Sequence, residues 1–171
     1  IHLLTVHGRT RHQRKFETGA ADWDMIKRVV DLFGDKIPIF ANGSIASRED
    51  VMRCFEHTGV DGVMSSEAIL EYPALFLEVE TRIGRIQLAQ EYMELAKQYP
   101  PREGGQGSGV KCLRVHIHRF LHEDLEADLV SRKGVAEAET WEGLWEIVQR
   151  IARRQEAENH DTQSESLGWY M

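Results

Sequence analysis

The fold is decided by residues 36–44, which read Lys-Ile-Pro-Ile-Phe-Ala-Asn-Gly-Ser. Their first six residues form a short, mostly apolar run, which is typical of a strand in a parallel sheet that is covered on both faces. The Asn-Gly-Ser that follows is a polar glycine turn and ends the strand. A helix begins soon after it, because Ser47 is a favourable N-cap and acidic residues occupy the next turn.

Two further units of the same kind flank this one. Before it, a strand at Leu3–His7 ends in a polar glycine turn, and a helix follows at Asp22–Phe33, whose apolar residues recur at helical spacing. After it, a strand at Asp61–Met64 leads into Ser65–Ala68 and a short helical stretch. Strands that alternate with helices over short links predict an α/β fold with a parallel sheet.

The residues able to carry chemistry all follow directly after strands. They are His7-Gly8-Arg9, Asn42-Gly43-Ser44 and Ser66-Glu67. The carboxyl ends of parallel strands meet at one edge, which in a (β/α)8 barrel is the rim that carries the active site and often a phosphate. Backbone N–H groups at glycine turns and helix N-termini direct partial positive charge at an anion. The sequence therefore predicts an anion site at this rim.

The second half of the chain has no strand pattern. It predicts helices at Pro73–Arg82, Ile86–Tyr99, Val110–Leu129 and Trp141–Arg154. Residues 100–109 are rich in proline and glycine and separate the second helix from the third. The predicted divisions are residues 1–76 for the α/β part, 77–154 for an all-α domain and 155–171 for a disordered acidic tail.

The net charge and the local charge of the chain give opposite indications about nucleic-acid binding. The 171 residues include 21 Lys+Arg and 28 Asp+Glu, and the net charge of −7 argues against nonspecific binding to nucleic acid. Residues 1–15 and 104–122, however, contain basic side chains and no acidic one. Phosphates respond to such local patches, because charge is screened beyond about 10 Å. A solvated face is the alternative interpretation of either stretch.

Membrane, secretory and metal-binding features are not predicted. No apolar run approaches the roughly 20 residues of a membrane-spanning helix, and no secretory signal is recognisable. Cys54 and Cys112 are predicted to be structural thiols in a reducing compartment. His118 and His122 share a helix face but lack a third ligand, so no metal is expected.

Three motifs at the strand ends are specific in combination. They are Thr-Val-His-Gly-Arg-Thr at 5–10, Ile-Phe-Ala-Asn-Gly-Ser-Ile at 39–45 and Gly-Val-Met-Ser-Ser-Glu-Ala at 62–68. Together they resemble the tRNA-dihydrouridine synthases. The Ser-Glu pair, with Pro-Ala-Leu-Phe at 73–76 behind it, is most similar to the eukaryotic branch that modifies positions 16 and 17 of tRNA. Residues 91–96 and 110–116 extend the resemblance into the helical half.

The resemblance implies a fold and a set of ligands. The chain would be the C-terminal part of a TIM (β/α)8 barrel, its last three βα units, followed by an all-α domain that binds tRNA. In such enzymes NADPH or NADH reduces an FMN, which passes hydride to a uridine of the D-loop that has been flipped out of its stack. The resemblance also implies a monomer when full length, in the cytoplasm or also in the nucleus, with no membrane or metal partner.

Site residues follow from the same resemblance. The implied FMN-binding residues are His7, Asn42, Gly43, Ser44, Ser66 and Glu67. The implied RNA-binding residues are Arg9, Arg11, Lys111, Arg114 and Arg119, with Arg9 facing the RNA or the rim of the flavin. Glu67 is expected to act through its backbone N–H with its side chain turned away, because a carboxylate repels a phosphate.

The catalytic residues of that family are not expected within this chain. The resemblance places its cysteine and its flavin-contacting lysine before Ile1, and the sequence opens within a strand pattern. We therefore expect a fragment of a longer enzyme that is inactive by itself. Two alternatives stay open, a non-catalytic tRNA-binding remnant and another FMN- or phosphate-binding barrel oxidoreductase that acts on a small molecule.

Overall fold

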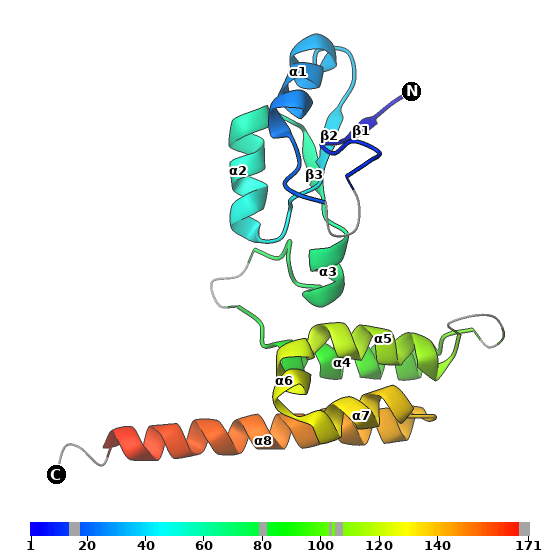
Figure 1. The fold of residues 1–171 in the computed structure, drawn as a ribbon, viewed down its shortest axis with the longest axis vertical. Helices are drawn as coiled ribbons and strands as arrows, with labels where there is room; N and C mark the ends of the chain where they lie inside the picture. The colour runs from blue at the N-terminus through cyan, green and yellow to red at the C-terminus, as the bar shows by residue number, and fades with distance from the viewer. Residues whose placement is uncertain (14–17, 79–81, 103, 105–107, 168–171) are drawn as a thin grey trace. The chain divides into compact units, whose positions relative to one another are not determined.

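The computed structural model of the chain describes residues 1–13, 18–78, 82–102, 104 and 108–167. These residues belong to two compact units, Ile1–Glu78 and Val79–Met171 (Figure 1). The first unit contains all the strands of the described part, and the second contains helices. Arg14 and Lys15, which contribute to the basic stretch at 1–15, lie outside the described residues.

The first unit is built on a parallel sheet of three strands in the order β1-β2-β3. Its strands are β1 (Leu4–His7), β2 (Ile39–Asn42) and β3 (Gly62–Met64). His7 is the register partner of Asn42, and Asn42 is that of Met64, so the three strands end in one row. The predicted parallel sheet is confirmed, and the turns after the strands emerge at a single edge.

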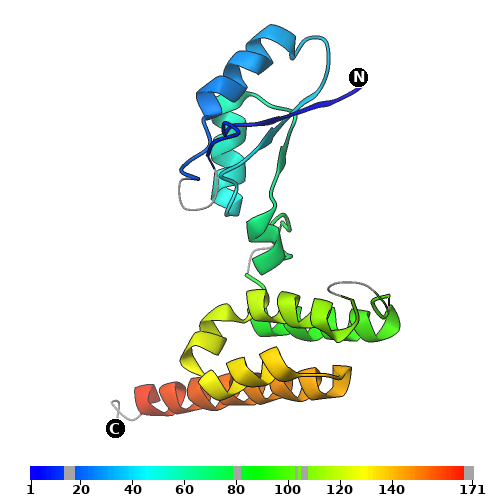
Figure 2. The same ribbon diagram turned by 45° about the vertical axis from the view of Figure 1, so that its right-hand side comes forward.

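Helices α1 (Trp23–Phe33) and α2 (Arg48–Thr58) cover one face of this sheet (Figure 2). Their shared core consists of Ile26, Ile39, Ala41, Ile45, Cys54 and Val60, all buried. Both helices begin at a capping side chain: Asp22 accepts a hydrogen bond from the Met25 N–H, and Ser47, the predicted N-cap, forms a reciprocal capping box with Asp50. Helix α3 (Glu67–Glu71) follows β3 almost directly.

The second unit consists of five helices in its described part. They are α4 (Arg85–Gln98), α5 (Val110–Phe120), α6 (His122–Ala127), α7 (Leu129–Glu137) and α8 (Trp141–Leu167). Helix α8 packs against α4 and α7, and α5 packs against α4 and α7 (Figure 1). The core between them includes Met93, Leu113, Ile117, Phe120, Leu121, Leu125, Val135, Leu144, Val148 and Ile151.

Several helix boundaries differ from the sequence-based predictions. The sequence predicts a helix at Pro73–Arg82, but no helix spans the described part of this range. Helix α3 ends before it, at Glu71. The next residue, Tyr72, precedes Pro73, and a residue before proline disfavours the helical conformation. The predicted helix Val110–Leu129 is divided at Leu121, whose φ is −109°, and again at Asp128. Helix α8 continues past Arg154, so the predicted tail is helical up to Leu167, while residues 168–171 lie outside the described part.

Helix α7 is absent from the predictions, although its N-cap is a recognisable signal. The Asp128 carboxylate accepts hydrogen bonds from the N–H groups of Val130 and Ser131, both at 3.0 Å, and from the Ser131 hydroxyl. Arg154 adds an ion pair to it at 3.3 Å. The bonds from Ser131, first of all the one from its hydroxyl, hold the pKa of Asp128 below its usual range.

Replacing Asp128 with alanine is expected to destabilise the helical unit by about 1–2 kcal/mol at pH 7. The depressed pKa in the folded state means that Asp128 contributes stability above its unfolded pKa of about 3.9 and loses it as pH falls through the folded value. The difference in unfolding free energy between parent and variant should therefore shrink below about pH 4. Urea titrations followed by circular dichroism at several pH values measure it.

Thr140→Ala is the matched control for this prediction. The Thr140 hydroxyl caps α8 by accepting the Gly143 N–H at 3.1 Å, and it does not titrate in this range. Its loss should cost a similar free energy at every pH. A destabilisation by Asp128→Ala that stays constant from pH 7 to pH 2.5 would contradict the role of the carboxylate charge.

The described part of the chain contains no helix that is both long enough and apolar enough to cross a membrane.

Candidate functional site

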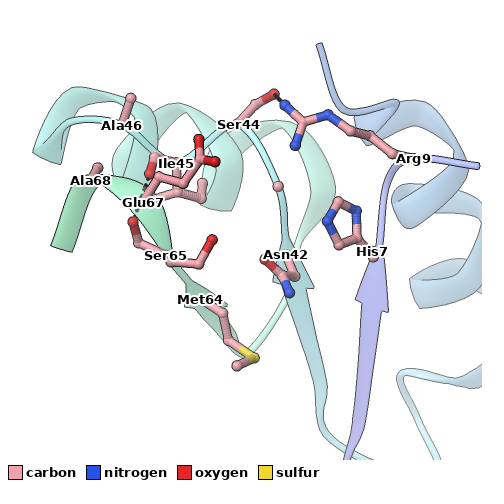
Figure 3. Close-up of a pocket in the computed structure, with 12 residues that line it drawn as sticks. His7, Arg9, Asn42, Ser44, Ile45, Ala46, Met64, Ser65, Glu67 and Ala68 are labelled. Carbon is pink, nitrogen blue, oxygen red and sulfur yellow. Dashed lines mark hydrogen bonds between the residues drawn. The ribbon is translucent and has the colours of Figure 1, made fainter. Parts of the chain in front are cut away.

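A hollow of about 160 Å³ lies at the edge where the three strands end (Figure 3). It is lined by all six of the residues predicted to bind a cofactor, namely His7, Asn42, Gly43, Ser44, Ser66 and Glu67. Arg9, predicted to face RNA or flavin, lines it as well. The register of the sheet explains this convergence, because it aligns the ends of β1, β2 and β3.

The turn after β2 has an unusual backbone conformation. Gly43 has a φ of +106° and Ser44 a φ of +59°, so two consecutive residues lie in the left-handed region. Only glycine suits the first position, because a Cβ there would lie 2.9 Å from the Ala21 Cβ and 3.1 Å from the His7 Cε1. Within the described residues, no acceptor bonds the backbone N–H groups of Gly43 and Ser44. Successive N–H groups of such a turn can bind an anion.

Contacts from the loop before α1 hold this turn in place. The Ser44 hydroxyl accepts the Ala21 N–H at 2.7 Å and an N–H of the Arg9 guanidinium at 3.2 Å. Arg9 also donates through Nε to the Gly19 carbonyl at 2.9 Å. Figure 3 shows the guanidinium reaching the Ser44 side chain across the rim. The conformation of the turn thus depends on tertiary hydrogen bonds.

Two supporting residues are missing from the sequence-based site. The Trp23 indole N–H donates to the Gly43 carbonyl at 3.2 Å, although its helical spacing indicates a core residue. The Ser65 hydroxyl donates to the Ile45 carbonyl at 2.8 Å and joins the ends of β2 and β3. Nothing in the sequence distinguishes Ser65 from its neighbour Ser66, whereas the indole N–H of a tryptophan at a helix start could have suggested a polar role for Trp23.

The electrostatics of the hollow are mixed. Arg9 supplies a permanent positive charge, and within the described residues no carboxylate forms an ion pair with it. Glu67, the first residue of α3, brings a carboxylate to the same hollow. An anion bound here is therefore attracted by Arg9 and by backbone N–H groups and is repelled by Glu67 unless the carboxylate turns away.

Three basic residues of α5 lie around a shallow hollow of about 450 Å³. Its lining includes Lys111, Arg114 and Arg119, all predicted to bind RNA, together with His118 and the apolar Val115, Val135 and Ala136. The Arg114 guanidinium donates to the Ala136 carbonyl of α7, which orients it. None of these three cations forms an ion pair within the described residues. Arg11, in the first unit, is exposed in the turn that follows Arg9.

The cysteines do not form part of the rim hollow. Cys54 is fully buried in the core beneath the sheet, and burial raises the pKa of its thiol. Cys112 belongs to α5 of the helical unit. Among the described residues, no group of three His, Cys, Asp or Glu side chains could hold a metal ion.

The family model and three relatives that match this chain all carry the name dihydrouridine synthase. The model of one family, dihydrouridine synthase (Dus), matches residues 1–158. Over 153 residues the chain is 39% identical to a tRNA-dihydrouridine(16/17) synthase-like protein of Mus musculus, covering 89% of this chain and 30% of the relative. Over 152 residues it is 32% identical to the tRNA-dihydrouridine(16/17) synthase of Saccharomyces cerevisiae, covering 82% and 35%.

A third relative is the probable tRNA-dihydrouridine synthase 1 of Synechocystis, which is 37% identical over 114 residues, or 60% of this chain and 31% of the relative. The mouse and yeast proteins also carry NAD(P)(+) in their names. The chain spans about a third of the length of these relatives.

Proposed function

The chain belongs to the dihydrouridine synthase family, and from this membership and the rim geometry we propose that it binds FMN and tRNA for the reduction of uridine to dihydrouridine. The observation that carries the proposal is the left-handed Gly43–Ser44 turn beside Arg9. Unbonded backbone N–H groups next to a guanidinium suit a phosphate, which accepts several hydrogen bonds and carries negative charge.

The residues at the rim fit the phosphate end of FMN. Gly43 and Ser44 would donate backbone N–H groups to it, joined by those of Ser66 and Glu67 at the start of α3. His7 and Asn42, adjacent at the ends of β1 and β2, would lie next to the rest of the cofactor (Figure 3). When bound, FMN supplies hydride transfer from NADPH or NADH to uridine.

We propose that residues 1–76 are the last three βα units of a (β/α)8 barrel. Three parallel strands do not close a barrel, and among the described residues β1 and β3 each pair only with β2. In a closed barrel both of these strand edges would be paired, and the rim would be completed by further loops. Residues 77–154 are then the helical domain that binds tRNA.

The RNA contacts are assigned to Lys111, Arg114 and Arg119, with Arg11 as a further cation on the first unit. The three residues on α5 carry no competing ion pair in the described structure, so their charges are available to phosphates. Backbone contacts of this kind position the RNA and do not select a base. They would offset part of the few kcal/mol needed to flip a uridine out of its stack.

The proton donor of the reaction is assigned to a group outside this chain. The rim hollow contains neither cysteine nor lysine among its described lining residues, and Cys54 is buried. The 171-residue chain alone is therefore expected to bind its ligands without reducing uridine.

The test is a comparison of FMN with riboflavin, which has the same ring system without the phosphate. The chain is expected to bind FMN at least tenfold more tightly than riboflavin, because a charge-assisted hydrogen bond to phosphate contributes about 1.5–3 kcal/mol. Titration followed by flavin fluorescence measures both dissociation constants. Equal affinities for the two flavins, or no binding of either, would contradict an FMN-phosphate site on this chain.

A further inference from the structure

The Ser44 hydroxyl has an unusual hydrogen-bonding state. A hydroxyl oxygen has two acceptor lone pairs and one O–H donor. Both acceptor positions of Ser44 are occupied, by the Ala21 N–H at 2.7 Å and by Arg9 Nη2 at 3.2 Å. The oxygen cannot accept a further bond, so any additional partner of Ser44 must accept a hydrogen bond from its O–H.

No such acceptor is present among the described residues. The Ser44 O–H donates to none of them, although Ser44 lines the rim hollow. Ser44 thus has an O–H without an acceptor among the described residues and also lines the rim hollow. A ligand that places an acceptor oxygen there would complete the bonding of the hydroxyl.

Two hydrogen bonds hold the Arg9 guanidinium against the Ser44 hydroxyl. Its Nε donates to the Gly19 carbonyl at 2.9 Å while Nη2 donates to Ser44, so two points of the planar guanidinium are held. The side chain is half-buried and lies against Ser44 on the rim (Figure 3). A cation bonded to the hydroxyl oxygen makes the O–H a stronger donor, because hydrogen bonds in a chain polarise one another.

We propose, on the basis of the proposed FMN function, that Arg9 is a positioning residue that acts through Ser44, whose side-chain hydroxyl donates to the phosphate of the flavin. The Arg9–Ser44 pair then selects a phosphorylated ligand over its unphosphorylated analogue. This assigns Ser44 a side-chain role in addition to that of its backbone N–H. It assigns the guanidinium of Arg9 to the rim of the barrel in place of RNA.

Ser44→Gly removes the hydroxyl alone and so tests its contribution. Glycine adopts a φ of +59° without strain, so the turn and its backbone N–H groups are retained while the O–H is lost. Arg9→Met removes the guanidinium and keeps an apolar stem, and the double variant tests the coupling of the two residues. Arg28→Met is the matched control, because Arg28 is exposed on α1 of the same unit and does not line the rim hollow.

The readout is the ratio of riboflavin to FMN dissociation constants, measured with the 171-residue chain. Ser44→Gly should reduce this ratio about tenfold, the contribution of one hydrogen bond to a charged group. Arg9→Met should reduce it by no more than that, because it removes only the group that positions the hydroxyl. The double variant should resemble Ser44→Gly, because Arg9 acts through Ser44. Arg28→Met should leave the ratio unchanged. Circular dichroism and thermal unfolding verify that each variant is folded.

The outcomes separate this proposal from the FMN assignment. A parent chain that does not prefer FMN over riboflavin overturns both the FMN assignment and the role of the Ser44 hydroxyl. A parent that prefers FMN, with a Ser44→Gly variant that keeps the full preference, overturns the role of the hydroxyl and leaves FMN binding intact. An Arg9→Met effect that persists undiminished in the Ser44→Gly background shows that Arg9 acts directly on the phosphate. If Arg9→Met does not fold, Ser44→Gly alone decides whether the hydroxyl selects the phosphate.

Discussion

Replacing Gly43 with alanine is expected to abolish the preference of the chain for FMN and to destabilise the sheet unit by about 2–3 kcal/mol. The φ of +106° is accessible to glycine and costly for any residue with a Cβ. The added Cβ would also lie 2.9 Å from Ala21 and 3.1 Å from the His7 ring, so the turn must move. Its N–H groups would then no longer converge on the phosphate, and we expect FMN affinity to fall more than tenfold.

Gly59→Ala provides a control with matched backbone strain. Gly59 ends α2 with a φ of +70°, yet the nearest atom to an added Cβ is Val30 Cγ1 at 3.9 Å. This variant should be destabilised by roughly 1–2 kcal/mol with the riboflavin-to-FMN ratio unchanged. Flavin titrations and thermal unfolding on both variants give the comparison. A Gly43→Ala chain that binds FMN like the parent would refute the placement of the phosphate at this turn.

Removing two cations from α5 should weaken tRNA binding and its dependence on salt. The test variant is Lys111→Gln/Arg119→Gln. We expect the slope of the logarithm of its tRNA association constant against the logarithm of salt concentration to decrease in magnitude by about 2, one unit for each lost phosphate contact. Both side chains border the hollow on α5, and neither is paired with an acid in the described structure. Fluorescence anisotropy of a labelled tRNA at several salt concentrations measures the slope.

Arg114 is left unchanged in this experiment, because its bond to the Ala136 carbonyl joins α5 to α7 and its loss would also affect packing. The control is Lys97→Gln/Arg153→Gln, which removes the same charge from exposed positions on α4 and α8. Because the Lys97 ammonium also lies 4.6 Å from the centre of the Trp141 ring, thermal unfolding must show that both double variants are folded. An equal change of slope in both double variants would indicate that only the net charge of the chain matters. No change in either would place the RNA elsewhere.

The elements with strong local signals were predictable from the sequence. Asp22, Ser47 and Gly59 bound α1 and α2 where capping chemistry places them, because an N-cap bonds N–H groups within three residues and a left-handed glycine ends a helix locally. The apolar run before Asn42 is a buried strand for a similarly local reason, since Ile39 and Ala41 alternate into the core.

The helical unit was predicted less completely. The apolar stripe of Leu113, Ile117 and Leu125 indicates one helix, yet the chain bends at Leu121 so that Phe120, Leu121 and Leu125 all reach the same core. On α4, periodicity favours Leu95 as an inward residue, whereas Leu95 is 57% exposed and Met93 is fully buried. Which stripe is buried depends on the neighbouring helices α5 and α8, and periodicity within α4 contains no information about them.

At the rim, the set of residues that meet could be predicted from the sequence. Strand ends in a parallel sheet share an edge, so His7, Asn42 and Ser66 had to lie near one another once the strands were recognised. The hydrogen bonds that Arg9, Trp23 and Ser44 form there could not be predicted from it. These bonds join residues 10 to 35 positions apart. Such contacts depend on how the residues before and at the start of α1 pack against the turn after β2, and local periodicity contains no information about that packing.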